Sequence, residues 1–276
     1  MILITGASGI VGREVVKELE FKGISYKIAS RQKGGEHIYF DFRDPLSFRP
    51  ALHGVKKLFL LRPPELADAR KYFLPVIKAA KEEGVEHIVF LSLLGAEKNP
   101  VVPHSKIEKF IKKSGIPYTF LRPSFFMQNL FSQHGEELRD EKVIFVPAGK
   151  GKTSFIDVRD IGAVAAKILI EQGHEYKAYS LTGSQALDYY EVADILSKET
   201  GEPIRYINPS MSQFRDKMQA KGIPKVFITV MIGIYFTAKI GLAKKVTPEL
   251  EQLLGRKPIT VKEFAHDYRM EFQKKS

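Results

Sequence analysis

The sequence of 276 residues contains neither cysteine nor tryptophan. Without cysteine the chain cannot form a disulfide bond, bind a metal through thiolates or use a thiol as a nucleophile. We predict no metal site, and a reducing compartment such as the cytoplasm is the expected location. The apolar fraction of 44% and the charged fraction of 27% are typical of an ordinary globular protein.

Long hydrophobic segments are also absent. The longest apolar run, Val226–Phe236, is too short to cross a bilayer, and Lys239 follows it closely. The run is either a buried or pocket-lining helix or a helix on a membrane surface, although the second kind normally has a clear polar face. The beginning, Met1–Gly6, lacks the basic region of a signal peptide and reaches a glycine turn at once. We therefore expect no membrane span.

Acidic residues are few relative to basic ones. Lys and Arg number 43 against 32 Asp and Glu, which gives a net charge of +11. The excess is spread along the chain in short groups such as Lys112-Lys113 and Lys244-Lys245. A basic surface attracts anionic cofactors. No recognisable nucleic-acid motif and no alternation of aromatic with basic residues accompanies the charge, so we expect no nucleic-acid partner.

The first half of the chain alternates short apolar runs with amphipathic stretches, which predicts parallel strands joined by helices. The fold class expected is α/β, a Rossmann-type doubly wound parallel sheet with a smaller, mainly helical C-terminal domain. The predicted strands are Ile2–Thr5, Tyr26–Ser30, His37–Asp41, Lys57–Leu61, His87–Ser92, Thr119–Arg122 and Ala178–Leu181, and the predicted helices are Val11–Phe21, Arg70–Glu83, Ser105–Lys113 and Asp160–Ile170.

The alternation of apolar runs with amphipathic stretches does not continue in the second half of the chain. Short strands are predicted at Val143–Phe145 and Ser154–Asp157, and the pattern beyond Asp188 is mainly helical. We therefore predict a Rossmann domain over residues 1–124, completed by about 155–183. Residues 125–154 and 184–276 would form a smaller substrate-binding cap.

A glycine-rich turn directly follows the first predicted strand. Its three glycines are spaced Gly-x-x-Gly-x-x-Gly and open the first helix. Such a turn lets the backbone approach a pyrophosphate, which the N–H groups of the helix N-terminus bind. The spacing resembles the short-chain dehydrogenase/reductase superfamily. The predicted phosphate-binding residues are Thr5, Gly6, Ser8, Gly9, Ile10, Val11 and Gly12.

The end of the second strand bears on the choice of cofactor. Enzymes that prefer NAD place an acidic residue there, but this strand ends Ser30-Arg31-Gln32-Lys33. A guanidinium group binds a 2′-phosphate through forked, charge-assisted hydrogen bonds. Arg31 therefore predicts NADP(H) in preference to NAD(H), the alternative being an exposed basic turn.

Motifs further along resemble the NmrA-like family of atypical short-chain dehydrogenase/reductases, including its quinone reductase and azoreductase members. They cover nearly the whole chain. The segments that carry the resemblance are His104–Glu108, Ser114–Asn129, Phe155–Ile161, Leu181–Gly183 and Leu254–Pro258.

The resemblance implies further cofactor contacts. Asp41 would accept a hydrogen bond from the adenine amino group with Phe42 beside the ring, although a turn-capping role for Asp41 is an open alternative. The backbone after the fourth strand would pass the cofactor ribose. The further residues implied are Leu61, Arg62, Pro63, Ser92, His104, Pro123, Ser124 and Phe126.

The usual catalytic Tyr-x-x-x-Lys of short-chain dehydrogenases is missing. If Lys106 is aligned with the family lysine, Val102 occupies the tyrosine position, and if His104 is aligned with it, Pro100 does. The candidate catalytic residues are then His104, which would bind the ribose or protonate a substrate, and Asn129, which would orient it. The alternatives are a histidine at a helix entry with no chemical role and an amide on a helix surface.

Four apolar side chains either line a flat apolar pocket or belong to the core. They are Tyr118, Phe125, Phe126 and Met127. Two functions fit these residues. The first is an oxidoreductase that transfers hydride from NADPH to a quinone-like or other electrophilic small molecule, which needs no strong acid. The second is a redox sensor that binds NADP(H) and a protein partner without turnover. An epimerase fits less well because such enzymes normally need the missing tyrosine.

Overall fold

The computed structural model describes residues 1–32, 34–35 and 37–274, which form two compact units. The first unit contains the described residues of 1–123, 158–181 and 252–255, and the second contains residues 124–157, 182–251 and 256–274. The prediction had assigned residues 252–255 to the cap, whereas their contacts lie in the first unit. No helix in the described part of the chain combines the length and apolarity needed to span a membrane.

The first unit is built on a seven-stranded sheet whose neighbouring strands are all parallel. This confirms the predicted doubly wound Rossmann-type sheet. All five residues of β5 are buried, as expected for a strand covered on both faces. In spatial order the strands are β10 (Lys177–Leu181), β6 (Tyr118–Pro123), β5 (His87–Leu91), β4 (Lys57–Leu61), β1 (Ile2–Ile4), β2 (Tyr26–Ser30) and β3 (Ile38–Tyr39).

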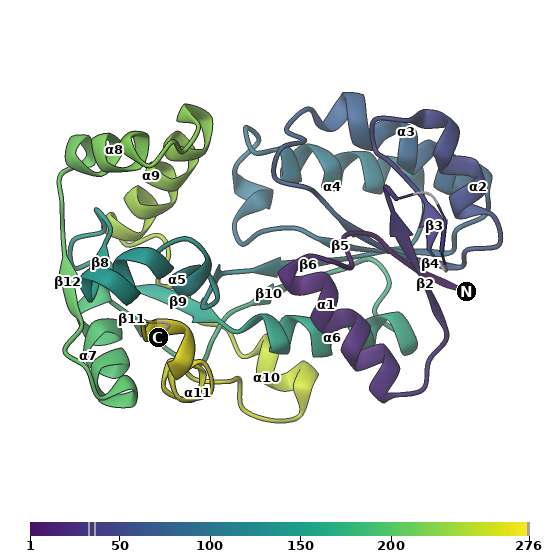
Figure 1. Ribbon diagram of the computed structural model, residues 1–276. Coiled ribbons are helices and arrows are strands. Elements are labelled where there is room, and N and C mark those ends of the chain that lie inside the picture. Colours follow the sequence, from purple (N-terminus) through teal and green to yellow (C-terminus); the bar gives the residue numbers. More distant parts are fainter. Residues whose placement is uncertain (33, 36, 275–276) are drawn as a thin grey trace. The chain divides into compact units, whose positions relative to one another are not determined.

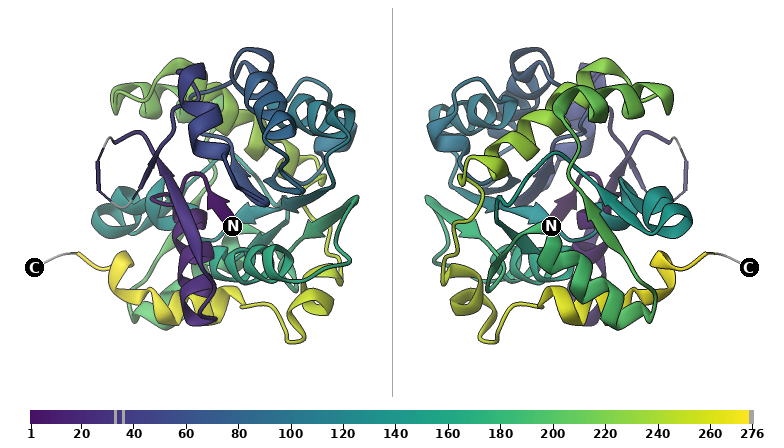
Figure 2. Two further views of the ribbon diagram at one scale, coloured as in Figure 1. Left: turned by 90° about the vertical axis from the view of Figure 1, so that its right-hand side faces the viewer. Right: turned by 90° about the vertical axis from the view of Figure 1, so that its left-hand side faces the viewer.

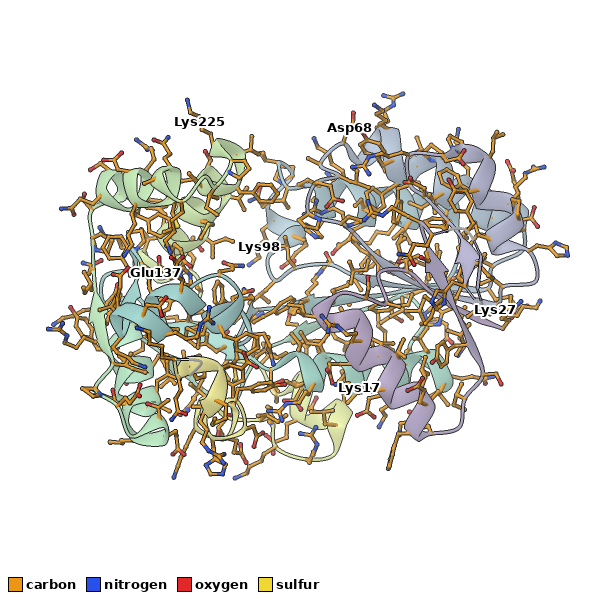
Figure 3. The ribbon with its side chains drawn as sticks, in the orientation of Figure 1. Lys17, Lys27, Asp68, Lys98, Glu137 and Lys225 are labelled. Atoms are coloured by element: carbon orange, nitrogen blue, oxygen red, sulfur yellow. The ribbon has the colours of Figure 1, made fainter. Side chains whose placement is uncertain are left out.

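Helices cover both faces of this sheet, as Figures 1 and 2 show. On one face α1 packs closely on α6, and a Cβ atom at Gly162 would lie only 2.6 Å from the Cβ of Glu14. The helices of the opposite face include α3, whose N-cap Asp68, labelled in Figure 3, accepts hydrogen bonds from two backbone N–H groups. The helices are α1 (Ile10–Phe21), α6 (Val158–Ile170), α2 (Phe48–Leu52), α3 (Ala69–Glu82) and α4 (Pro103–Ser114).

The strand order places a topological switch between β1 and β4. The chain runs from β1 to β2 and β3 on one side, and then through β4, β5, β6 and β10 on the other. In open α/β sheets, ligands bind beyond the carboxyl ends of the strands at such a switch. The candidate ligand-binding residues are therefore those that follow β1, β4 and β5.

The second unit has its own apolar core, which includes Tyr189, Phe214 and Tyr235. Strand β12 (Arg205–Ile207) pairs with β8 (Val143–Phe145), although the sequence predicted mainly helix there. The other elements are β7 (Phe125–Phe126), α5 (Asn129–Ser132), a π-helix (Glu137–Glu141), β9 (Thr153–Ile156), β11 (Ala186–Leu187), α7 (Tyr189–Thr200), α8 (Met211–Ala220), α9 (Lys225–Lys239) and α11 (Val261–Asp267), while α10 (Glu249–Leu254) crosses the division between the units.

Candidate active site

The glycine turn after β1 has the geometry of an anion-binding cradle. Gly6 has a φ of +68°, and a Cβ atom at Gly12 would lie 2.1 Å from the carbonyl oxygen of Gly6. Gly9 caps α1, and no side chain from the described residues caps it in its place. The first N–H groups of α1 are thus left for an anionic ligand, so this turn fits the pyrophosphate of a dinucleotide.

The residues of the turn contribute in different ways. Ser8 is exposed and Ile10 is 36% exposed, whereas Val11 is buried, so Val11 offers only its backbone N–H. The Thr5 hydroxyl is committed elsewhere, because it donates to the Phe59 carbonyl and accepts from the Leu61 N–H. The Thr5 side chain thus connects β1 to β4, and a cofactor contact of Thr5 stays a prediction.

Arg31 lies just beyond β2, at the expected end of that strand, and is exposed. The neighbouring Ser30 hydroxyl accepts a hydrogen bond from the backbone N–H of Gln32, which closes the turn. Lys33 lies outside the described residues. The contact of Arg31 with a 2′-phosphate stays a prediction.

The segment after β3 changes the expected adenine contacts. The Asp41 carboxylate accepts a hydrogen bond from the backbone N–H of Arg43, which is the turn-capping alternative. Phe42 is buried, and its ring centroid lies 4.9 Å from that of Phe40 and 4.8 Å from that of Phe73. The Phe42 ring is thus part of the core, because its apolar area is covered by other rings. An adenine contact there would fall mainly to the backbone.

Arg62 organises the loop after β4 in a way that the sequence did not reveal. Its guanidinium donates hydrogen bonds to the carbonyl oxygens of Pro63, Pro64 and Leu66 at 2.9 to 3.3 Å. Burial lowers its pKa, although Glu65 acts in the opposite direction. The role of Arg62 is therefore to shape the loop that is predicted to pass the ribose, and Leu61 and Pro63 lie in the same segment.

His104 lies in the first turn of α4 and is largely buried. Its Nε2 lies 3.4 Å from the Nε–H of Arg62, which donates to it. The proton of the ring is then on Nδ1, which is buried and has no hydrogen-bond partner among the described residues. Burial, and secondarily the charge of Arg62, lowers the pKa of His104 to about 3.

A neutral ring cannot act as an imidazolium acid near neutral pH, so that part of the prediction for His104 is not supported. The unpartnered Nδ1–H is instead a hydrogen-bond donor in need of an acceptor. A ribose hydroxyl or a substrate oxygen would provide one.

Ser92, at the end of β5, is part of a buried polar network. Its hydroxyl donates to Glu108 at 2.6 Å, and Arg122 donates to both oxygens of the same carboxylate at 3.0 and 2.6 Å. Glu97 lies 3.2 Å from Arg122 as a second acidic partner. The Ser92 proton is thus committed to Glu108, and its cofactor contact, which could only be as an acceptor, stays a prediction. No sequence motif indicated this network.

Pro123 ends β6 in the first unit, where its carbonyl accepts from the Leu94 N–H. Ser124, Phe126 and Asn129 belong to the second unit. The Ser124 hydroxyl is buried without a hydrogen-bond partner among the described residues, and Asn129 begins α5. The cofactor and substrate roles predicted for these residues stay predictions.

The proposed aromatic pocket residues are largely core residues. Tyr118 stacks on Phe120 at 4.3 Å in the first unit. In the second unit, Phe125 packs edge-on against Phe155, and Met127 is buried. Met127 is thus a core residue, whereas Tyr118 and Phe125 are half-buried against the cores of their units.

Helix α9 in the second unit is apolar on both its covered and its open face. Ile228 and Tyr235 are buried, while the opposite side is solvent-exposed. Exposed apolar surface of this extent usually marks a binding surface. The exposed apolar residues of α9 are Val226, Phe227, Val230, Ile234 and Phe236.

Comparison with known proteins gives a consistent result. Residues 1–265 match the NmrA-like family. The chain is 34% identical over 278 residues to the NAD(P)H azoreductase of Xenophilus azovorans, with 96% of each chain covered.

Two solved structures are similar over nearly their full length. One is an NADPH-dependent quinone oxidoreductase from Escherichia coli complexed with NADPH, with a TM-score of 0.88, 29% identity and coverage of 97% of this chain and 99% of that one. The other is a triphenylmethane reductase from Citrobacter sp. complexed with NADP(H), with a TM-score of 0.87, 28% identity and coverage of 98% and 100%.

Proposed function

Because this chain is an NAD(P)H-dependent reductase of the NmrA-like family, we propose that it transfers hydride from NADPH to a quinone-like or other small electrophilic acceptor. The proposal depends most on one observation. The positions from which a short-chain dehydrogenase would supply its acid hold no group that can protonate a carbonyl strongly at neutral pH.

Three features of the first unit support that observation. The tyrosine position holds Val102 or Pro100, depending on the alignment. Ser92 donates its proton to Glu108. His104 is held neutral by burial and by Arg62. Reduction of an ordinary ketone needs a strong acid at the oxygen, whereas a quinone accepts hydride to form a stabilised anion. Water or the Nδ1–H of His104 can assist such an anion by hydrogen bonding.

The residues proposed to hold the dinucleotide are the N–H groups at the start of α1 and the guanidinium of Arg31. Bound NADPH supplies the hydride. The helix N-terminus attracts the pyrophosphate through its partial positive charge. Arg31 would provide a forked contact to the 2′-phosphate, which NADH lacks. We therefore propose a preference for NADPH.

The exposed apolar face of α9 supports an apolar acceptor. Val226, Val230 and Ile234 recur every four residues along it, and Lys225 at its beginning points outward in Figure 3. Aromatic acceptors have extensive apolar area, and burial of that area contributes about 25 cal/mol per Å². This face of the second unit is therefore suited to bind apolar area.

The test is a fluorescence titration with NADPH and NADH, followed by NADPH oxidation with a quinone, an azo dye and an unactivated ketone. We expect tighter binding of NADPH, oxidation by the quinone or the azo dye, and none by the ketone. Tight binding without oxidation by any acceptor would refute the reductase proposal and favour a sensor that binds a protein partner. Ketone reduction at a rate comparable to that of the quinone would contradict the argument from the missing acid.

A further inference from the structure

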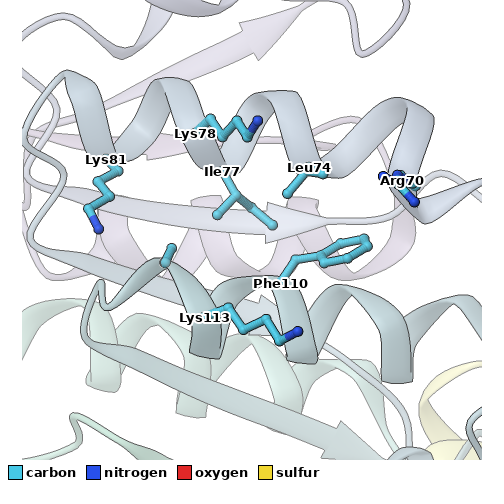
Figure 4. A pocket seen from close by; sticks show the side chains of 8 residues that line it. Arg70, Leu74, Ile77, Lys78, Lys81, Phe110 and Lys113 are labelled. Carbon is cyan, nitrogen blue, oxygen red and sulfur yellow. The ribbon is translucent and has the colours of Figure 1, made fainter.

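A groove runs between α3 and α4 in the first unit. It has a volume of about 500 Å³, and eight residues line it. Figure 4 shows Leu74 and Ile77 on α3 facing Phe110 on α4, so the floor is apolar. None of the eight residues is among those proposed to bind the dinucleotide. A volume of this size is within the range of small-molecule sites, roughly 300 to 1,000 Å³.

The polar rim of the groove is almost entirely cationic. None of its basic side chains forms an ion pair with a described residue, although pairs are frequent elsewhere on the surface, as between Lys152 and Glu191. The acidic residues of the two helices are engaged away from the groove, Glu82 with Arg49 and Glu108 with Arg122. The basic residues that line the groove are Arg70, Lys78, Lys81 and Lys113.

The cations lie at defined positions around the apolar floor. Arg70 and Lys81 stand at opposite ends of α3 in Figure 4, and eleven residue steps of 1.5 Å separate them by roughly 16 Å. At the Arg70 end, the Asp68 carboxylate caps the helix, and its negative charge would repel an anionic ligand. At the other end, the Lys81 Nζ lies 4.0 Å from the ideal Cβ position of Gly115, two residues after Lys113. Figure 4 shows Lys81 at this end of α3 and the Lys113 side chain extending along α4 towards Phe110, so the two ammonium groups flank the apolar floor from different helices.

We propose that this groove binds a small amphipathic anion. The aliphatic or aromatic body lies on Leu74, Ile77 and Phe110, and its carboxylate, phosphate or sulfonate group lies between Lys81 and Lys113. The C-termini of α3 and α4 at this end carry partial negative charge, about half a unit each, which the two ammonium groups outweigh. A twofold contact of two such grooves is disfavoured, because it would bring the same cations face to face.

The proposal is tested by calorimetric titration of the full chain with octanoate, acetate and octanol. Octanoate carries both features of the expected ligand, whereas acetate lacks the apolar body and octanol lacks the charge. We expect octanoate to bind more tightly than either. Equal affinity for octanoate and octanol would overturn the role of the cations, and equal affinity for octanoate and acetate would overturn the role of the floor.

A pair of double variants locates the site. Lys81→Gln with Lys113→Gln should weaken octanoate binding about tenfold, since two charge-assisted contacts are lost. Lys71→Gln with Lys109→Gln removes the same charge from exposed positions of the same helices outside the groove and should leave the affinity unchanged. NADPH affinity should be unchanged in both, which reports that the sheet is intact. An equal loss of octanoate affinity in both variants would refute the assignment to this groove.

Discussion

The substitution Gly9→Ala separates the folding of the phosphate turn from its binding function. Gly9 has φ −77° and ψ 169°, an extended conformation that alanine adopts without strain. Its added Cβ atom would meet only the carbonyl oxygen of Gly6, at 3.3 Å. The stability of the ligand-free chain should therefore change by no more than about 1 kcal/mol, the usual range for the residue at a helix N-cap.

The effect on NADPH should be much larger, because the new methyl group occupies the surface that the pyrophosphate must approach. Loss of one or two charge-assisted hydrogen bonds costs about 2.7 kcal/mol, which is a hundredfold in affinity. At a concentration of about 100 times the original Kd, NADPH stabilises the original chain by about 2.7 kcal/mol, but it stabilises the variant by only about 0.4 kcal/mol. The assay is thermal unfolding with and without NADPH. A domain of this size gains roughly 2 to 4 °C per kcal/mol, so a shift of about 5 to 10 °C should fall to about 1 °C.

Gly12→Ala is the matched comparison. Its Cβ atom would lie 2.1 Å from the Gly6 oxygen and 2.8 Å from the Cα atom of Ala7, so the backbone has to move. We expect this variant to lose stability in the absence of ligand as well. If Gly9→Ala kept the full NADPH-induced shift, the assignment of the turn to the pyrophosphate would be wrong. If both variants lost the same stability without ligand, the geometric distinction between them would be wrong.

Three further predictions concern single side chains. Arg31→Glu should weaken NADPH at least about tenfold and leave NADH nearly unchanged in fluorescence titrations, since only NADPH has the 2′-phosphate; equal losses would argue against that contact. The pKa of His104 is lowered in the folded state to about 3. Its contribution to stability is therefore complete above the unfolded pKa of about 6.5 and is lost as the pH falls towards 3, at up to about 1.4 kcal/mol per pH unit. His104→Gln should accordingly make the urea stability less dependent on pH between 7 and 5, and an unchanged slope would show that His104 is not buried and neutral. Arg122→Met should cost about 3 kcal/mol in urea unfolding because it leaves the buried Glu108 unpaired, and adding Glu108→Met should recover most of that loss; additive losses would contradict the pairing.

The sheet of the first unit was predictable because its signal is local. Apolar runs such as Lys57–Leu61 and His87–Leu91 are buried on both faces and are bounded by turns or helical patterns. Strand β12 was missed for the converse reason. It has three residues, and only Tyr206 is buried, so neither length nor alternation distinguishes it from a loop. It exists because it pairs with β8, more than 55 residues earlier in the sequence.

The site shows the same division between local and distant determinants. The glycine turn was recognised because its geometry depends on neighbouring residues. The hydrogen-bond partners of the hydroxyl groups were not predictable because they are distant in the sequence: Thr5 bonds to Phe59 on the neighbouring strand, and Ser92 bonds to Glu108 on the following helix. A sequence motif identifies a hydroxyl at the end of a strand, but it does not show which acceptor takes its proton.

The partners of these groups also limit the chemistry. The Ser92 proton is donated to Glu108, and the His104 ring, which accepts from Arg62 and has a lowered pKa, is neutral, so neither side chain is a strong acid near neutral pH. Proton donation raises the rate of a reduction only when the oxygen gains charge that it cannot otherwise disperse. An acceptor whose conjugated system disperses that charge depends mainly on position relative to the hydride. The missing tyrosine, the committed Ser92 proton and the neutral His104 ring therefore all support the proposed acceptor class, quinones and other conjugated electrophiles.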